Sequence, residues 1–262
     1  MVKWYKKIDG KERVLDVPTK TRPMNLPTVA ALNNRGVVIK SPEAVWIDID
    51  AQMGTDAFFY ELALDAEGTL TGTIDSKYSG YNARPERRAY IEKQDGQHWT
   101  ERFEDFSEVG VELVETKDLD DVNKPFREKL NLNIPEAAMV AGDFIYFSPI
   151  LYSNFKENDL KMEKRFFPVD MAYPIQEQIV MKLRIPEGYA IEELPEVTNL
   201  TLPNNAGKFR YAVSEKDEQN IQLVATFKLN QYQFDPTEYP RLREMFDIVA
   251  EKYGEQIVLK KM

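Results

Sequence analysis

The stretch IQLVATFKL, residues 221–229, decides the fold because an apolar side chain stands at every second position from Ile221 to Leu229. Residues 179–185 (IVMKLRI) and 209–213 (FRYAV) repeat this alternation. A period of two places the apolar side chains on one face of a β-strand and the polar side chains on the other. The three stretches therefore predict antiparallel sheets packed on a single side.

The first half of the chain carries the same signal. Residues 58–64 alternate, and Glu67-Gly68 marks a turn into residues 70–78, so this region predicts a β-hairpin. Further short strands are expected at residues 109–113, 130–134 and 144–147.

The pattern changes to a helical one between Asn82 and Ser107. Trp99, Phe103 and Phe106 recur at spacings of four and three, which indicates a helix.

The C-terminal helix is the best-specified element. Asp235 is a candidate cap, Pro236 suits the first helical position, and Glu238 follows the cap by three residues. Gly254 is placed to end this helix before a short strand at 256–259. The stripe expected to be buried has spacings of three and four and comprises Tyr239, Leu242, Phe246, Val249 and Tyr253.

Together these elements predict a β-rich α+β fold with mainly antiparallel sheets. Residues 45–155 are expected to form one α+β unit. Residues 163–262 are expected to form a β-sandwich-like unit closed by one amphipathic helix, and the charged stretch 156–164 to cross the surface between them. Residues 1–44 are proline-rich and weakly periodic, so we expect an appendage that completes a domain lying upstream.

The composition of the chain disfavours several classes of partner. The chain has 262 residues and a net charge of −10, which disfavours nucleic acid and anionic membranes as partners. No apolar run reaches the roughly 20 residues that span a bilayer, so membrane insertion is not expected. The basic start is not followed by an apolar segment, so we expect no signal peptide in this chain.

The chain contains no cysteine and one histidine, His98. A cysteine nucleophile with a histidine base, or a zinc site of cysteines and histidines, cannot be built from this composition. We expect His98 to be structural. The aspartates 118, 120 and 121 lack the turn glycine and distal glutamate of a calcium loop, so we predict a solvated acidic loop. We extend that prediction to Asp48, Asp50 and Asp56, and we expect no metal and no cofactor.

Three further patterns leave alternatives open. The 44 acidic residues allow many glycosidase-like carboxylate pairs, and none stands out. Residues 199–201 (NLT) match the N-glycosylation triplet, which also arises by chance. An aromatic platform for a sugar is conceivable, but such aromatics are usually core. Its members would be Tyr78, Tyr81, Tyr90 and Trp99.

Several segments resemble one family in their order and spacing. They are residues 165–170 (RFFPVD), 185–189 (IPEGY), 193–195 (ELP), 239–246 (YPRLREMF) and 255–261 (EQIVLKK). These segments are similar to the last domain of bacterial transglutaminase-like proteins, in which a papain-type catalytic domain is flanked by β-rich domains of unknown function. Residues 14–16 (VLD), 26–27 (LP) and 33–39 (NNRGVVI) resemble the end of the catalytic domain and the segment that follows it.

The resemblance implies that Asp16 corresponds to the third member of a Cys–His–Asp triad. The cysteine and histidine would lie upstream of Met1, and a carboxylate without an imidazole to orient performs no catalysis. We therefore expect no enzymatic activity and no catalytic residue in this chain.

The expected role is a non-catalytic accessory or interaction module of an exported, periplasmic transglutaminase-like protein. The expected partner is the upstream domain or another protein. The alternative is a carbohydrate-binding β-rich module, which would need several coplanar aromatic rings exposed on one face. We instead expect Trp46 and Trp99 to be largely buried and no row of three exposed aromatics to occur.

Overall fold

The structure is a computed structural model, and it describes all residues except 1–3, 9–10, 16–18, 33, 41–42 and 94–96. Its centre is an eight-stranded sheet with the order β14-β15-β16-β12-β5-β6-β8-β7. Every neighbouring pair in it is antiparallel except β12 and β5, which are parallel. The strands are β5 (Gly54–Leu64), β6 (Leu70–Ser79), β7 (Gly110–Lys117), β8 (Phe126–Ile134), β12 (Ile175–Arg184), β14 (Thr198–Thr201), β15 (Gly207–Asp217) and β16 (Asn220–Leu229).

The strands predicted from alternation are confirmed. The predicted hairpin is β5–β6, and Gly68 in its turn has φ +88°, beside the Ala138 carbonyl. The two predicted units, 45–155 and 163–262, each contribute four strands to this one sheet and meet at the parallel β5–β12 pair. The unit boundaries themselves remain a prediction.

A second sheet has four strands in the order β13-β18-β10-β9. Its members are β9 (Ala138–Ala141), β10 (Phe144–Phe147), β13 (Tyr189–Glu193) and β18 (Ile257–Lys261). Buried residues of both sheets belong to one continuous apolar core. The β-rich α+β fold with mainly antiparallel sheets and a C-terminal helix is therefore confirmed.

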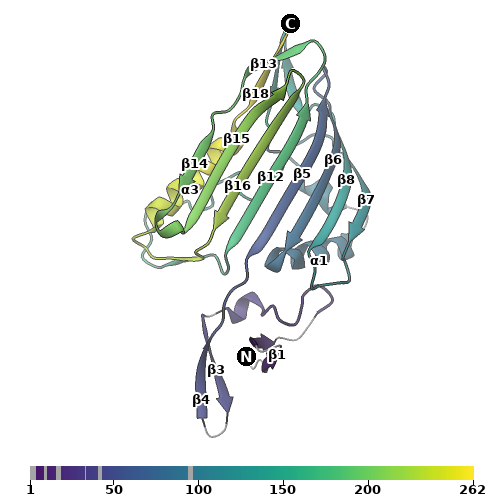
Figure 1. Cartoon of the computed structure of the whole chain (residues 1–262). Helices are drawn as coiled ribbons and strands as arrows, with labels where there is room; N and C mark the ends of the chain where they lie inside the picture. Colours follow the sequence, from purple (N-terminus) through teal and green to yellow (C-terminus); the bar gives the residue numbers. More distant parts are fainter. Residues whose placement is uncertain (1–3, 9–10, 16–18, 33, 41–42, 94–96) are drawn as a thin grey trace.

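Helix α3 (Tyr239–Gly254) packs on the inner face of the large sheet (Figure 1). The whole predicted stripe is buried, and Phe246 meets Phe227 of β16 edge to face at 5.3 Å. The predicted start was too early, because Glu238 rather than Asp235 is the cap residue and Pro240 lies in the first turn. The Glu238 carboxylate still accepts a hydrogen bond from the Asp235 amide, at 2.9 Å.

The segment 156–164 was predicted as a surface crossing, but part of it is anchored on α3. The Asn158 side chain is buried, and its amide donates to the Asp247 carboxylate at 2.7 Å. The Tyr239 hydroxyl of α3 donates to the Met162 carbonyl at 2.6 Å.

Helices α1 (Ala83–Lys93) and α2 (Gln97–Arg102) cover the inner face over β5, β6 and β8, behind the sheet in Figure 1. None of the described elements covers the outer face of the eight-stranded sheet in this view. None of the described helices is long and apolar enough to cross a bilayer.

The remaining elements are short. Two hairpins precede the sheet and project below it in Figure 1, namely β1 (Trp4–Ile8) with β2 (Lys11–Leu15) and β3 (Arg35–Lys40) with β4 (Glu43–Asp48). A small ladder joins β11 (Val169–Asp170) to β17 (Gln233–Phe234). Single 3-10 turns lie at Val29–Ala31, Gly80–Asn82 and Pro203–Asn205.

Candidate functional site

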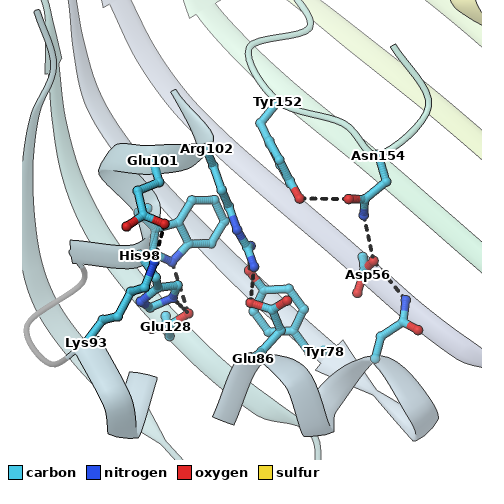
Figure 2. Close-up of polar contacts among 12 residues, drawn as sticks. Asp56, Tyr78, Glu86, Lys93, His98, Glu101, Arg102, Glu128, Tyr152 and Asn154 are labelled. Carbon is cyan, nitrogen blue, oxygen red and sulfur yellow. Dashed lines mark hydrogen bonds and ion pairs between the residues drawn. The ribbon is translucent and has the colours of Figure 1, made fainter. Parts of the chain in front are cut away.

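A group of polar side chains is enclosed where α1 and α2 meet the inner face of the sheet. Figure 2 shows them converging from α1, α2, β5, β6, β8 and the segment after β10. Two of these side chains, Asp56 and Glu128, are acidic residues on sheet strands and are almost fully buried, and Glu177 of the neighbouring strand β12 is buried as well. A buried charge is costly unless it is paired or neutralised, so these residues mark the candidate site.

Glu128 of β8 is held by two donors from α2. Its Oε2 lies 3.2 Å from His98 Nε2 and accepts a hydrogen bond from Trp99 Nε1 at 3.0 Å. The His98 side chain is buried, and its structural role remains a prediction. The other Glu128 oxygen, Oε1, and His98 Nδ1 are buried without a hydrogen-bond partner in the described part of the chain.

Glu86 of α1 forms an ion pair with Arg102 of α2. The Arg102 guanidinium also donates to the Tyr78 hydroxyl at 3.2 Å and lies 4.7 Å from the centre of the Trp99 ring. Burial raises the pKa of Glu86, although the positive charge of Arg102 opposes this shift. The pair is therefore a desolvated contact that fixes α1 against α2.

Glu86, His98 and Glu128 place one ligand atom each within 4.8 Å of one another, which is compact enough for a metal ion. Two of these groups already have cationic or N–H partners, because Arg102 pairs with Glu86 and Trp99 donates to Glu128. A metal ion would have to compete with the Arg102 guanidinium for Glu86. The arrangement therefore suits an internal ion pair better than a metal centre, and the expectation that the chain uses no metal stays a prediction.

Asp56 of β5 faces the same interior. Its Oδ2 accepts hydrogen bonds from the side-chain amides of Asn82, at 2.8 Å, and Asn154, at 3.4 Å (Figure 2). Burial, with a smaller contribution from the negative charge of Glu86, raises the pKa of Asp56 to about 7. Asp56 is 6% exposed, so the prediction that it belongs to a solvated acidic loop is wrong.

A cavity of about 280 Å³ lies beside Asp56 and Glu86. Asn82, Asn154 and Tyr173 supply further polar groups to its wall. The Tyr173 ring stacks on Tyr81 with ring centres 4.5 Å apart, and its hydroxyl donates to the Asn82 side chain at 3.2 Å. The cavity can accept a small polar molecule, and Asp56 could exchange a proton near neutrality.

Glu177 of β12 lies next to this wall and is fully buried. The Ser153 hydroxyl donates to Glu177 Oε1 at 2.5 Å, and the backbone N–H of Asn154 donates to Glu177 Oε2 at 3.2 Å. Burial raises the pKa of Glu177 to about 8, against the opposing effect of these hydrogen bonds. Glu177 thus fixes the segment 153–154, which in turn supplies a donor to Asp56.

The burial of these acids could have been predicted from the alternation of inward and outward residues along each strand. Asp56, Glu128 and Glu177 each stand two residues before an apolar inward position, namely Phe58, Leu130 and Ile179. Each acid is therefore in phase with the buried face of its strand.

The other aspartates considered in the sequence lie in different surroundings. The loop 118–124 is folded around the buried Arg87, whose guanidinium donates to the carbonyls of Asp118, Leu119, Asp121 and Lys124. Its carbonyls thus surround a cation supplied by the protein itself. Asp48 and Asp50 are exposed, as predicted, but Asp48 is the last residue of β4 and pairs with Arg35 rather than lying in a loop. Asp16 lies outside the described residues, and the prediction of no catalytic residue and no cofactor remains a prediction.

The aromatic residues considered for a sugar platform lie in or against the core. Tyr78, Tyr81 and Trp99 are buried, and Tyr90 packs on the core. The expectation for Trp46 is wrong, because its side chain is 68% exposed on β4. The exposed aromatic residues of the described part are Trp46, Phe59, Phe166 and Phe167, and they form no row of three on one strand.

Trp46 belongs to an apolar face of the β3–β4 hairpin. Trp46 stands directly opposite Val37, and Ile39 stands opposite Ala44, so these four side chains share one face. Ile39 is 84% exposed and Val37 47% exposed. We call these four residues the hairpin face.

Comparison with known proteins gives one family match over part of the chain and one similar solved structure. Residues 143–259 match the model of a family described as a domain of unknown function with a solved structure, DUF3858. A crystal structure from Parabacteroides distasonis, described as a "putative protease", aligns with 98% of this chain at 12% identity and a TM-score of 0.46. The chain spans 35% of that protein's length. No curated protein is significantly similar to the chain.

Proposed function

We propose that this chain is a non-catalytic accessory and interaction module of a larger, exported transglutaminase-like protein. The observation that carries the proposal is the hairpin face. An isolated two-stranded hairpin is at best marginally stable in water, and the exposure of its apolar side chains to water is unfavourable. Covering Val37, Ile39 and Trp46 with another domain would remove this apolar surface from water.

Two further observations support the same role. The motifs at 165–170 and 239–246, which resemble the last domain of transglutaminase-like proteins, fall within the match to a domain of unknown function over residues 143–259. The interior carboxylates are engaged by Arg102, His98, Trp99 and Ser153, which suits a structural network. The proposed partner of the hairpin face is the catalytic domain that precedes this chain in the longer protein.

The proposal is tested first by activity. The purified chain is incubated with amine donors, glutamine-containing peptides and an unrelated protease substrate. We expect no transamidation and no hydrolysis. Reproducible turnover that Asp56→Asn or Glu86→Gln abolishes, while Lys161→Gln on the exposed surface leaves it intact, would contradict the proposal.

The second test is the gene itself. The reading frame upstream of the codon for Met1 should encode a domain that contains the missing cysteine and histidine. A frame that contains no such domain would contradict the assignment to a transglutaminase-like parent, whatever the activity assay shows.

A further inference from the structure

The outer face of the eight-stranded sheet carries a charge opposite to that of the chain. Its outward positions hold nine basic and five acidic residues, a net charge of +4 on a chain whose net charge is −10. The basic residues are Lys77, Lys117, Arg127, Lys129, Lys182, Arg184, Lys208, Arg210 and Lys228. The acidic residues are Glu61, Asp75, Glu112, Glu115 and Asp217.

The basic residues are also segregated along the strands. One register row crosses all eight strands and contains Arg210, Lys77, Arg127 and Lys117, and the adjacent row contains Lys208 and Lys228. The other members of both rows are uncharged. We call these six residues the basic band. All five acidic residues of the outer face lie in the other rows.

The basic band is unfavourable in the free protein. Lys77 stands directly opposite Arg127, Arg127 opposite Lys117, and Lys208 opposite Lys228. Like charges in directly opposed positions destabilise a sheet. Within the described residues only Lys117 of the band has an ion-pair partner, Glu115. The other five cations of the band therefore have their charges available to an external group.

An apolar row runs directly beside the band. Ala212, Val224, Val180 and Phe59 stand opposite one another on four adjacent strands, and Phe59 is 42% exposed. Phe59 and Val180 also line a shallow surface hollow of about 240 Å³. A protein segment can cover such a row with apolar side chains, which an acidic polysaccharide lacks. The net charge of −10 on the whole chain disfavours nucleic acid as the occupant.

We propose that the outer face is a docking surface for an acidic protein segment that also carries apolar side chains. The acidic groups pair with the basic band, and the apolar groups cover Phe59 and Val180. From Arg210 on β15 to Lys117 on β7 the band spans six strand spacings, roughly 29 Å. This surface is separate from the hairpin face, and it deepens the proposed role as an interaction module by stating the chemistry of a second partner.

The probe is a short fluorescein-labelled peptide in which glutamates surround a central Leu-Val-Leu, and its twin has glutamine in place of glutamate. Binding to the full chain is followed by fluorescence anisotropy. The glutamate peptide should bind, with an affinity that falls as NaCl is raised toward ~0.15 M, and the glutamine peptide should not. An acidic protein that binds an acidic peptide needs a local basic surface, which makes this result discriminating.

The variants locate the surface. Arg127→Glu with Arg210→Glu should weaken binding at least about tenfold, which corresponds to ~1.4 kcal/mol. The control, Lys161→Glu with Lys164→Glu, changes the net charge equally at exposed positions off this face and should leave binding unchanged. Phe59→Thr should weaken binding without any change in charge. If the charge reversals lower the melting temperature, Arg127→Gln with Arg210→Gln provides the same comparison.

Several results would overturn the proposal. They are absence of binding at low salt, equal losses in the band and control variants, and equal affinity for heparin, which would make the face a general polyanion site. Self-association of the chain that Arg127→Glu abolishes would assign the face to a second copy instead. None of these results bears on the upstream domain or on catalysis, so this proposal and the proposed function can fail independently.

Discussion

The two faces of the eight-stranded sheet are built from alternate residues of the same strands, yet they differ in chemistry. On β5, Phe58 is 1% exposed and its neighbour Phe59 is 42% exposed. The inner face encloses charged groups that have protein partners, such as Glu86 with Arg102. The outer face leaves Lys77 and Arg127 without ion-pair partners in the described part of the chain. Glu86 thus has a cationic partner inside the fold, whereas Lys77 and Arg127 are left available to an external partner.

The largest expected effect comes from breaking an inner ion pair. Arg102→Ala leaves the Glu86 carboxylate buried without its cation, which should cost roughly 3–5 kcal/mol in the free energy of unfolding. Lys182→Ala on the outer face, which breaks the exposed pair with Glu61, should cost less than about 1 kcal/mol. Urea denaturation of both variants measures the difference. Equal costs would mean that the inner pair is open to solvent.

The adjacent phenylalanines give a comparison without charge. Phe58→Ala removes a ring that meets Tyr78, Trp99 and Tyr152 edge to face, and it should destabilise the chain by roughly 3–5 kcal/mol. Phe59→Ala should cost about 1 kcal/mol or less because the ring is partly in water. Thermal unfolding of the two variants tests this. A larger loss for Phe59 would reverse the assignment of the faces.

The pH dependence of the free energy of unfolding should differ between the buried acids of the inner face and the acids of the outer face. Burial raises the pKa of Asp56 to about 7 and that of Glu177 to about 8, so these two acids bind more protons in the folded chain than in the unfolded chain between about pH 4 and pH 8. The stability that these protonated acids contribute is present at low pH and is lost as the pH rises through 7 to 8. The free energy of unfolding of Asp56→Asn, relative to that of the wild type, should therefore rise from pH 5 to pH 8.

The gain should be on the order of 1–3 kcal/mol, and chemical denaturation at both pH values measures it. Asp75→Asn on the outer face of β6 is the matched control and should show no such trend. A constant difference between Asp56→Asn and the wild type across this range would show that Asp56 stays ionised throughout.

The smallest expected effect concerns the basic band. Arg127→Glu places an acid between Lys77 and Lys117, so it should raise the free energy of unfolding by about 0.2–1 kcal/mol. The same change should weaken binding of the glutamate peptide. A rise in stability together with a loss of binding indicates that the band serves a partner and not the fold. A fall in stability would contradict the like-charge argument.

Most strands could be predicted because their alternation is local. The parallel β5–β12 pair could not, because alternation identifies a buried face but not the strand that lies beside it, and more than a hundred residues separate the two. The cap of α3 was misplaced because Asp235 and Pro236 form a turn before the helix, which starts at Tyr239 and has Pro240 in its first turn.

The site was harder to predict than the fold. Asp56 was grouped with Asp48 and Asp50 by residue type, although its position two residues before Phe58 places it on the buried face. Its donors, Asn82 and Asn154, come from segments that only the folded chain brings together. Trp46 was expected inside because aromatic residues are usually buried, and its exposure on the β3–β4 hairpin became visible only in three dimensions.

The most direct test of the central claim, that the chain acts by binding through exposed surfaces, uses Trp46 as its own reporter. The proposed upstream domain is purified and titrated into the chain while tryptophan emission is recorded, and the Trp46→Phe and Ile39→Thr variants are titrated in parallel. Covering the exposed indole should shift the emission saturably to shorter wavelength. The Trp46→Phe chain should show no such shift, and Ile39→Thr should weaken the binding. An unchanged spectrum at saturating concentrations of the upstream domain, with Trp46 still accessible to a soluble quencher, would contradict the account.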